Sequence, residues 1–117
     1  MKTTQQLERL SEQVNAVKYR TDETGHLAYV QVIAALKEVK LISSTLPHAE
    51  SITDRLDALI WMLSEYLSAG RFSARHRSVL EEKVLDFNVL FDELHFLVRR
   101  SAPLRADRYR SVHAQAA

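Results

Sequence analysis

The stretch SARHRSVLEEKVLDFNVLFDELHFLVRR, Ser73 to Arg100, carries the strongest periodic signal in the chain. Its apolar side chains recur at alternating intervals of four and three residues, the spacing of one side of an α-helix. The members of this stripe are Leu80, Val84, Phe87, Phe91, Leu94 and Val98. We therefore predict one long helix over this range. We expect it to close at Ser101 to Pro103, because the residue before a proline is disfavoured in helical geometry.

Three shorter segments precede it and also have helical spacing, at about Thr4 to Arg20, Thr24 to Ser43 and Ser51 to Ser68. Ser51 with Asp54 resembles a capping box at the start of the third segment. Four helices with short connections pack most simply as an antiparallel bundle. The predicted fold is therefore all-α, with a bundle over residues 1–102. An Arg-rich tail over 103–117, flexible or a short helix, follows it.

Composition narrows the choice of fold and chemistry. The chain has 117 residues, the size of one domain, and 46% of them are hydrophobic. Only 2 Gly and 2 Pro are present, too few for the many tight turns of a β-sandwich. No cysteine is present, which excludes disulfides and thiolate metal sites and fits a reducing compartment. No apolar run approaches the roughly 20 residues of a membrane span, so we expect a cytoplasmic protein.

The second segment is apolar on two sides. Leu27, Val30, Ala34 and Leu41 form one side of its helical wheel, and Tyr29, Val32, Leu36 and Val39 form another. A helix with two apolar sides is usually packed between two neighbours. We therefore expect the second segment to contribute to an additional buried surface.

Large apolar residues also fall opposite the core stripes of the third and fourth segments, namely Trp61, Leu85, Val89 and Phe96. An isolated bundle leaves such side chains in water unless the first segment or the tail covers them, and that alternative stays open. Exposed apolar patches mark interaction sites, and Trp is enriched at binding hot spots. The predicted partner-binding residues are these four together with Tyr29 and Leu36. We expect a regulator that masks a partner protein in an antiactivator-like or chaperone-like role, and we expect it to form a homodimer.

A different class of function rests on arginine. Two basic groups occur in the second half of the chain, Arg71, Arg75 and Arg77, and then Arg105, Arg108 and Arg110. Arginine clusters neutralise nucleic-acid phosphates, but they also occur as solvated faces. Nucleic-acid binding through these six residues is the alternative hypothesis.

The sequence offers few groups for catalysis. No paired His motif for metal, no glycine-rich phosphate loop and no nucleophile elbow occurs, so we expect no enzyme, cofactor or metal site. Asp92 and His95 place a carboxylate and an imidazole on adjacent turns, and their plain interpretation is a hydrogen-bonded pair at the core edge. A histidine phosphotransfer domain using His95 is the third hypothesis.

Overall fold

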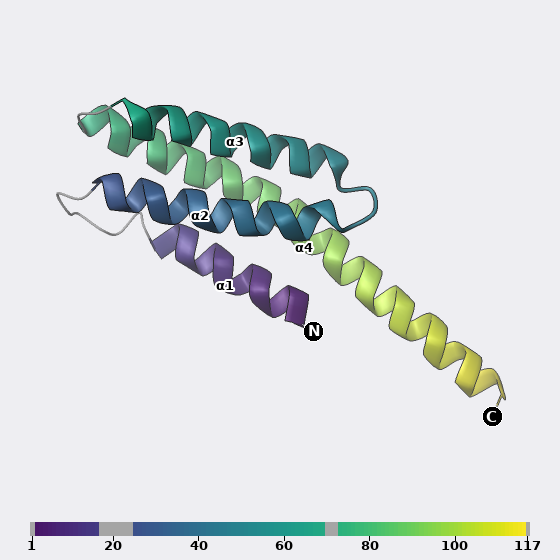
Figure 1. Cartoon of the computed structure of the whole chain (residues 1–117). Coiled ribbons are helices and arrows are strands. Elements are labelled where there is room, and N and C mark those ends of the chain that lie inside the picture. Colours follow the sequence, from purple (N-terminus) through teal and green to yellow (C-terminus); the bar gives the residue numbers. More distant parts are fainter. Residues whose placement is uncertain (1, 17–24, 70–72, 117) are drawn as a thin grey trace.

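The structure, a computed structural model, describes the backbone of residues 2–16, 25–69 and 73–116, and the side chains of residues 3–16, 26–69 and 73–100. It contains the helices α1 (Lys2–Ala16), α2 (Gly25–Ser44), α3 (Glu50–Ser68) and α4 (Ala74–Ala116). Successive helices run in opposite directions (Figure 1). The predicted all-α antiparallel bundle with a long last helix is confirmed.

The four helices form a closed ring of neighbours. Each helix packs against the next along the chain, and α1 also packs against α4. The backbone of α4 continues beyond the other three helices, so the molecule is elongated, with a longest dimension of 65 Å (Figure 1). The long helix thus has a bundled part and an extension.

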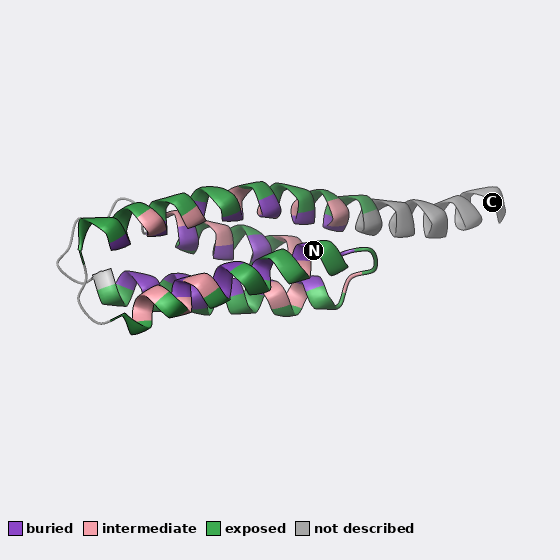
Figure 2. Cartoon of the chain, turned by 90° about the horizontal axis from the view of Figure 1, so that it is seen from above, coloured by how far each residue is buried: buried purple, intermediate pink, exposed green. Residues whose placement is uncertain are grey.

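The predicted stripes form the hydrophobic core. Buried residues (purple) lie along the inner sides of the helices, and exposed residues (green) lie along their outer sides (Figure 2). The stripe of α4 contributes Leu80, Val84, Phe87, Leu94 and Val98 to the core, with Phe91 partly buried against it. Burying each such side chain stabilises the fold by about 1.5–3 kcal/mol, which makes this stripe of α4 a main contributor to folding.

The prediction that Tyr29 and Leu36 contact a partner is wrong. Tyr29 is 1% exposed and Leu36 is fully buried, so neither side chain reaches the surface. The two-sided pattern of α2 was ambiguous about which side faces the core, and packing against three other helices selects this one. The other side, with Leu27, Val30 and Leu41, is exposed instead. In the described part of the chain, α2 is therefore not covered on both sides.

Two predicted helix ends also differ. Helix α3 begins at Glu50 after Ala49, which makes no side-chain capping bond, so Ser51 lies inside the first turn and forms no capping box. Helix α4 does not end at Pro103. Proline removes one helical hydrogen bond, but its fixed φ near −65° is compatible with a helix, so it disfavours continuation without forbidding it.

Specific polar contacts join neighbouring helices around the core. Asn15 of α1 and Asn88 of α4 exchange two amide hydrogen bonds, of 2.8 and 2.9 Å. Arg55 of α3 donates two bonds to the Glu93 carboxylate of α4, at 3.2 and 3.1 Å. Lys40 of α2 pairs with Asp57 of α3 at 2.6 Å. The exposed ion pairs contribute little energy, but the partly buried amide pair fixes the register of α1 on α4.

We expect Asn15→Ala and Asn88→Ala each to lower the free energy of unfolding by about 1–2 kcal/mol, because each leaves a partly buried amide without its partner. The double variant should cost less than the sum, with a coupling near 1 kcal/mol in urea unfolding. The exposed control Glu12→Ala should be close to neutral. Additive effects of the two Asn substitutions would contradict the pairing.

A buried aromatic cluster closes the end of the bundle where α4 begins. The hydroxyl of Tyr29 donates a 2.6 Å bond to the backbone carbonyl of His76, and the ring of Tyr66 meets the His76 ring edge-on. Ser73 lies 3.1 Å from Nδ1 of His76. Burial, with a smaller effect of Tyr66, raises the pKa of Tyr29 to about 12.

This raised pKa predicts a loss of stability in strong alkali. The unfolded tyrosine ionises near pH 10, whereas the folded one stays protonated to about pH 12. The stabilisation is complete below pH 10 and is lost as the pH rises toward 12, by up to about 2–3 kcal/mol. In urea unfolding between pH 9 and 12, Tyr29→Phe should lose less stability than the unsubstituted chain. Equal losses would show that Tyr29 is not the responsible group.

Candidate protein-binding surface

Four large apolar side chains lie on the outward sides of α3 and α4. Trp61 is 65% exposed, and Leu85, Val89 and Phe96 are 62%, 57% and 59% exposed. The last three lie opposite the buried stripe of α4, and we call them the outer stripe. The sequence-based prediction that these four side chains face outward is confirmed, and nothing in the described part of the chain covers them.

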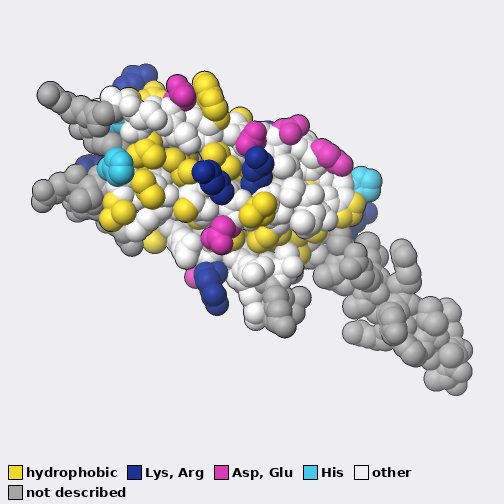
Figure 3. Space-filling model, in the orientation of Figure 1, with side chains coloured by type: hydrophobic (Ala, Val, Ile, Leu, Met, Phe, Trp, Pro, Cys, Tyr) yellow, Lys and Arg dark blue, Asp and Glu magenta, His cyan; other side chains and the backbone are white. Residues whose placement is uncertain are grey.

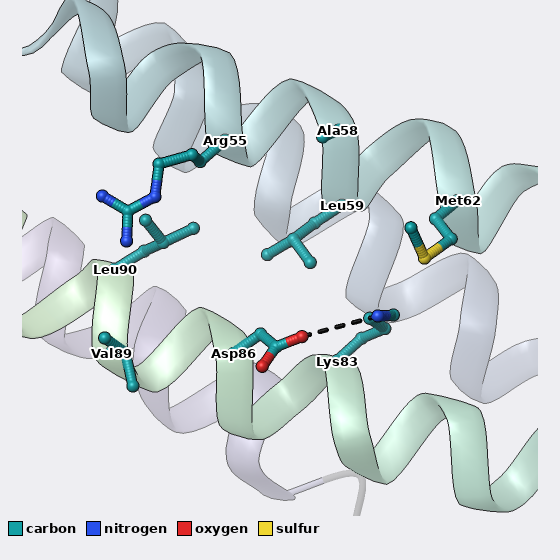
Figure 4. A pocket seen from close by; sticks show the side chains of 8 residues that line it. All are labelled: Arg55, Ala58, Leu59, Met62, Lys83, Asp86, Val89 and Leu90. Atoms are coloured by element: carbon teal, nitrogen blue, oxygen red, sulfur yellow. Dashed lines mark hydrogen bonds and ion pairs between the residues drawn. The ribbon is translucent and has the colours of Figure 1, made fainter.

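A groove between α3 and α4 borders the outer stripe at Val89. It has a volume of about 350 Å³, and Arg55, Ala58, Leu59 and Met62 line it from α3. Lys83, Asp86, Val89 and Leu90 line it from α4 (Figure 4). Val89 belongs to both the groove and the outer stripe, and Met62 is next to Trp61 in the chain. Leu59 and Leu90 give the groove an apolar floor between charged ends.

Lys83, one of three charged residues that line this groove, is held by two carboxylates. Its Nζ lies 3.2 Å from Glu82 and 3.5 Å from Asp86. Burial lowers the pKa of the Lys83 ammonium, but Glu82 and Asp86 outweigh that effect and leave the pKa above its usual value. A lysine acting as a base or nucleophile needs a lowered pKa. Lys83 is therefore a permanent cation in the groove wall.

The outward side of α2 is a further exposed apolar surface. Leu27, Val30 and Leu41 are 47%, 38% and 68% exposed on its outward side. Ala34 belongs to the same side and also lines a groove of about 380 Å³ between α1 and α2. On the face shown in Figure 3, apolar side chains (yellow) reach the surface among charged ones. The helical wheel of α2 contained this signal, and the error was to choose Tyr29 and Leu36, on the other apolar side, as the partner-facing residues.

The predicted basic groups do not form one patch among the described residues. Arg75 and Arg77 are exposed but lie two positions apart on α4, which points them about 200° apart around the helix. Between them, His76 is buried. Arg71, Arg105, Arg108 and Arg110 lie outside the residues whose side chains the structure describes.

His95 lies at the edge of the core, where the sequence predicted it, but with a different partner. Its Nε2 lies 3.3 Å from a carboxylate oxygen of Glu8 in α1, and its side chain is 19% exposed. The ring also stacks on Phe91. The expected pairing with Asp92 is absent from the contacts of the described residues. A phosphotransfer histidine must face solvent, and this one faces a carboxylate.

The described residues contain no group of three or more His, Asp or Glu side chains arranged to hold a metal ion. No helix among them combines the length and apolar content needed to cross a membrane. Comparisons with protein-family models, curated protein sequences and solved structures find no match to this chain.

Substitution by Asp should have a small effect on stability on the outward side of α4 and a large effect on its inward side. Leu85→Asp should change the free energy of unfolding by less than about 1 kcal/mol, because Leu85 is exposed. Leu94→Asp should remove more than about 4 kcal/mol or prevent folding, because it buries a carboxylate in the core. Thermal and urea unfolding followed by circular dichroism, on dilute protein, measures both. Unfolding by Leu85→Asp would place Leu85 in the core.

Proposed function

We propose that this chain is a non-catalytic protein-binding module that engages another protein through Trp61 of α3 and the outer stripe of α4. The observation that carries the proposal is the exposure of four large apolar side chains on two adjacent helices. Each Å² of apolar surface removed from water stabilises a complex by about 25 cal/mol. Four large exposed apolar side chains on one module therefore favour covering by a partner.

The groove between α3 and α4 supports binding of a helical segment. An amphipathic helix places its apolar face in such a groove, with anchors at helical spacing. Leu59 and Leu90 supply the apolar floor, while Arg55 and Lys83 on the walls are already paired with carboxylates of α4. A partner segment with an apolar stripe fits this arrangement.

The role that fits this mode of binding is regulation by masking. A module that covers a partner's apolar helical face competes with the partner's own interface, as an antiactivator or a chaperone does. This role rests on the type of surface and is a proposal about action. The absence of cysteine supports a reducing compartment, and we propose the cytoplasm as the location.

Capture of a partner on the immobilised full chain tests the proposal. One half of a source-cell lysate is treated with nuclease. We expect a discrete protein to be retained in both halves and its affinity to fall at least about tenfold with Trp61→Asp, since buried Trp anchors dominate binding energy. The matched control Asp54→Ala, on the exposed face of α3, should retain the protein.

Other results would contradict the proposal. If the retained material is lost after nuclease treatment, the function would instead be nucleic-acid binding through the arginine clusters. A protein retained equally by the Trp61→Asp variant, with unchanged helicity, would show that this surface is not the binding site.

A further inference from the structure

We propose that the outer stripe of α4 binds a second copy of this chain, through an antiparallel pairing of the two α4 helices about a two-fold axis. This inference rests on the proposed function, because it treats the outer stripe as a protein-binding surface. It identifies a second copy of this chain as the protein that binds there. Trp61 and the floor of the α3–α4 groove stay open in such a dimer for another protein.

The spacing of the outer stripe is self-complementary. Leu85 and Phe96 are equally distant from the point between Leu90 and Phe91. A two-fold axis at that point brings Leu85 of one chain against Phe96 of the other, and it does so twice. Val89 lies close to the axis in both chains. Leu85 and Phe96 therefore each find an apolar partner, as an isologous interface requires, whereas the same register places Val89 across from Asp92 of the second copy.

Charges at the two ends of the stripe match the same axis. Glu81 and Glu82 flank its beginning, and Arg99 and Arg100 flank its end, all exposed. Arg99 follows Glu81 by about five helical turns and so lies on the same edge of the helix, and Arg100 follows Glu82 in the same way. A two-fold axis keeps each edge with itself. Each acid therefore meets an arginine of the second copy, within about one residue's rise.

A parallel pairing of the same faces lacks this match. It places Glu81 and Glu82 of one chain beside the same two carboxylates of the second copy, and it places the Arg99 and Arg100 pairs beside each other. Like charges then repel at both ends of the stripe. The charge pattern thus selects the antiparallel arrangement. Phe96 already carries Arg100 at 5.9 Å from its ring centroid, which leaves the rest of the ring for Leu85 of the second copy.

One residue opposes the dimer and limits its affinity. Asp92 is exposed between Val89 and Phe96, and the two-fold axis brings its two copies near each other. With three large apolar side chains from each chain, the interface is at the small end of specific ones. We expect a dissociation constant on the order of 1–100 µM. Asp92→Asn should tighten it by removing the repulsion.

Charge reversal tests the pairing on the full-length chain by sedimentation equilibrium at several concentrations. The double variants Glu81→Arg with Glu82→Arg, and Arg99→Glu with Arg100→Glu, should each weaken dimerisation at least about tenfold, because each puts like charges opposite one another. Mixing the two variants should restore a dimer, because the opposed charges then match. The control Arg9→Glu with Lys37→Glu makes the same change of charge as the Arg99 and Arg100 variant, but on α1 and α2, and should have no effect.

The outcomes are separable from those of the capture experiment. A chain that stays monomeric well above 1 mM overturns this inference and leaves partner capture through Trp61 untouched. A dimer that ignores all four reversals also overturns it, since the contact then lies elsewhere. Fluorescence of Trp61, the single Trp of the chain, should be the same in monomer and dimer. A change in its emission on dilution would place Trp61 in the contact and contradict the proposed geometry.

Discussion

Burial of the inner stripe of α4 is the interaction on which the rest of the structure depends. Phe87 and Leu94 are fully buried, and they meet side chains from the other helices in one core. Once this side is fixed inward, the orientation of every other residue of α4 follows from helical geometry. The outer stripe is exposed as a consequence, and so are the carboxylates and guanidinium groups beside it.

The polar contacts then set how the helices align. Asn15 and Asn88 form their two hydrogen bonds only in one register of α1 on α4, and the exposed Arg55–Glu93 pair accompanies the observed register of α3 on α4. Core packing tolerates small shifts of similar apolar residues, whereas amide and carboxylate geometry does not. Apolar burial therefore supplies the stability, and these few contacts make the arrangement unique.

Helical periodicity was sufficient to predict the four helices, the core stripes and the outward direction of Trp61, Leu85, Val89 and Phe96. It failed where two patterns competed. The two apolar sides of α2 are equivalent in sequence, and only packing with three other helices decides that Tyr29 is buried and Leu41 exposed. Local signals at Ser51 and Pro103 were also overruled, since a cap or a proline shifts a helix end by small energies. The contact of His95 with Glu8 joins distant parts of the chain, and no local pattern contains it.

The chain lacks cysteine, so single cysteines introduced by substitution report contacts without background. The most direct test of the account is disulfide formation between two variants, Leu85→Cys and Phe96→Cys, mixed under mild oxidation. We predict a covalent dimer in the mixture and little in either variant alone, because a thiol at position 85 meets position 96 of the other chain. Cross-linking of Leu85→Cys with itself, or none in the mixture, would contradict an antiparallel pairing of α4.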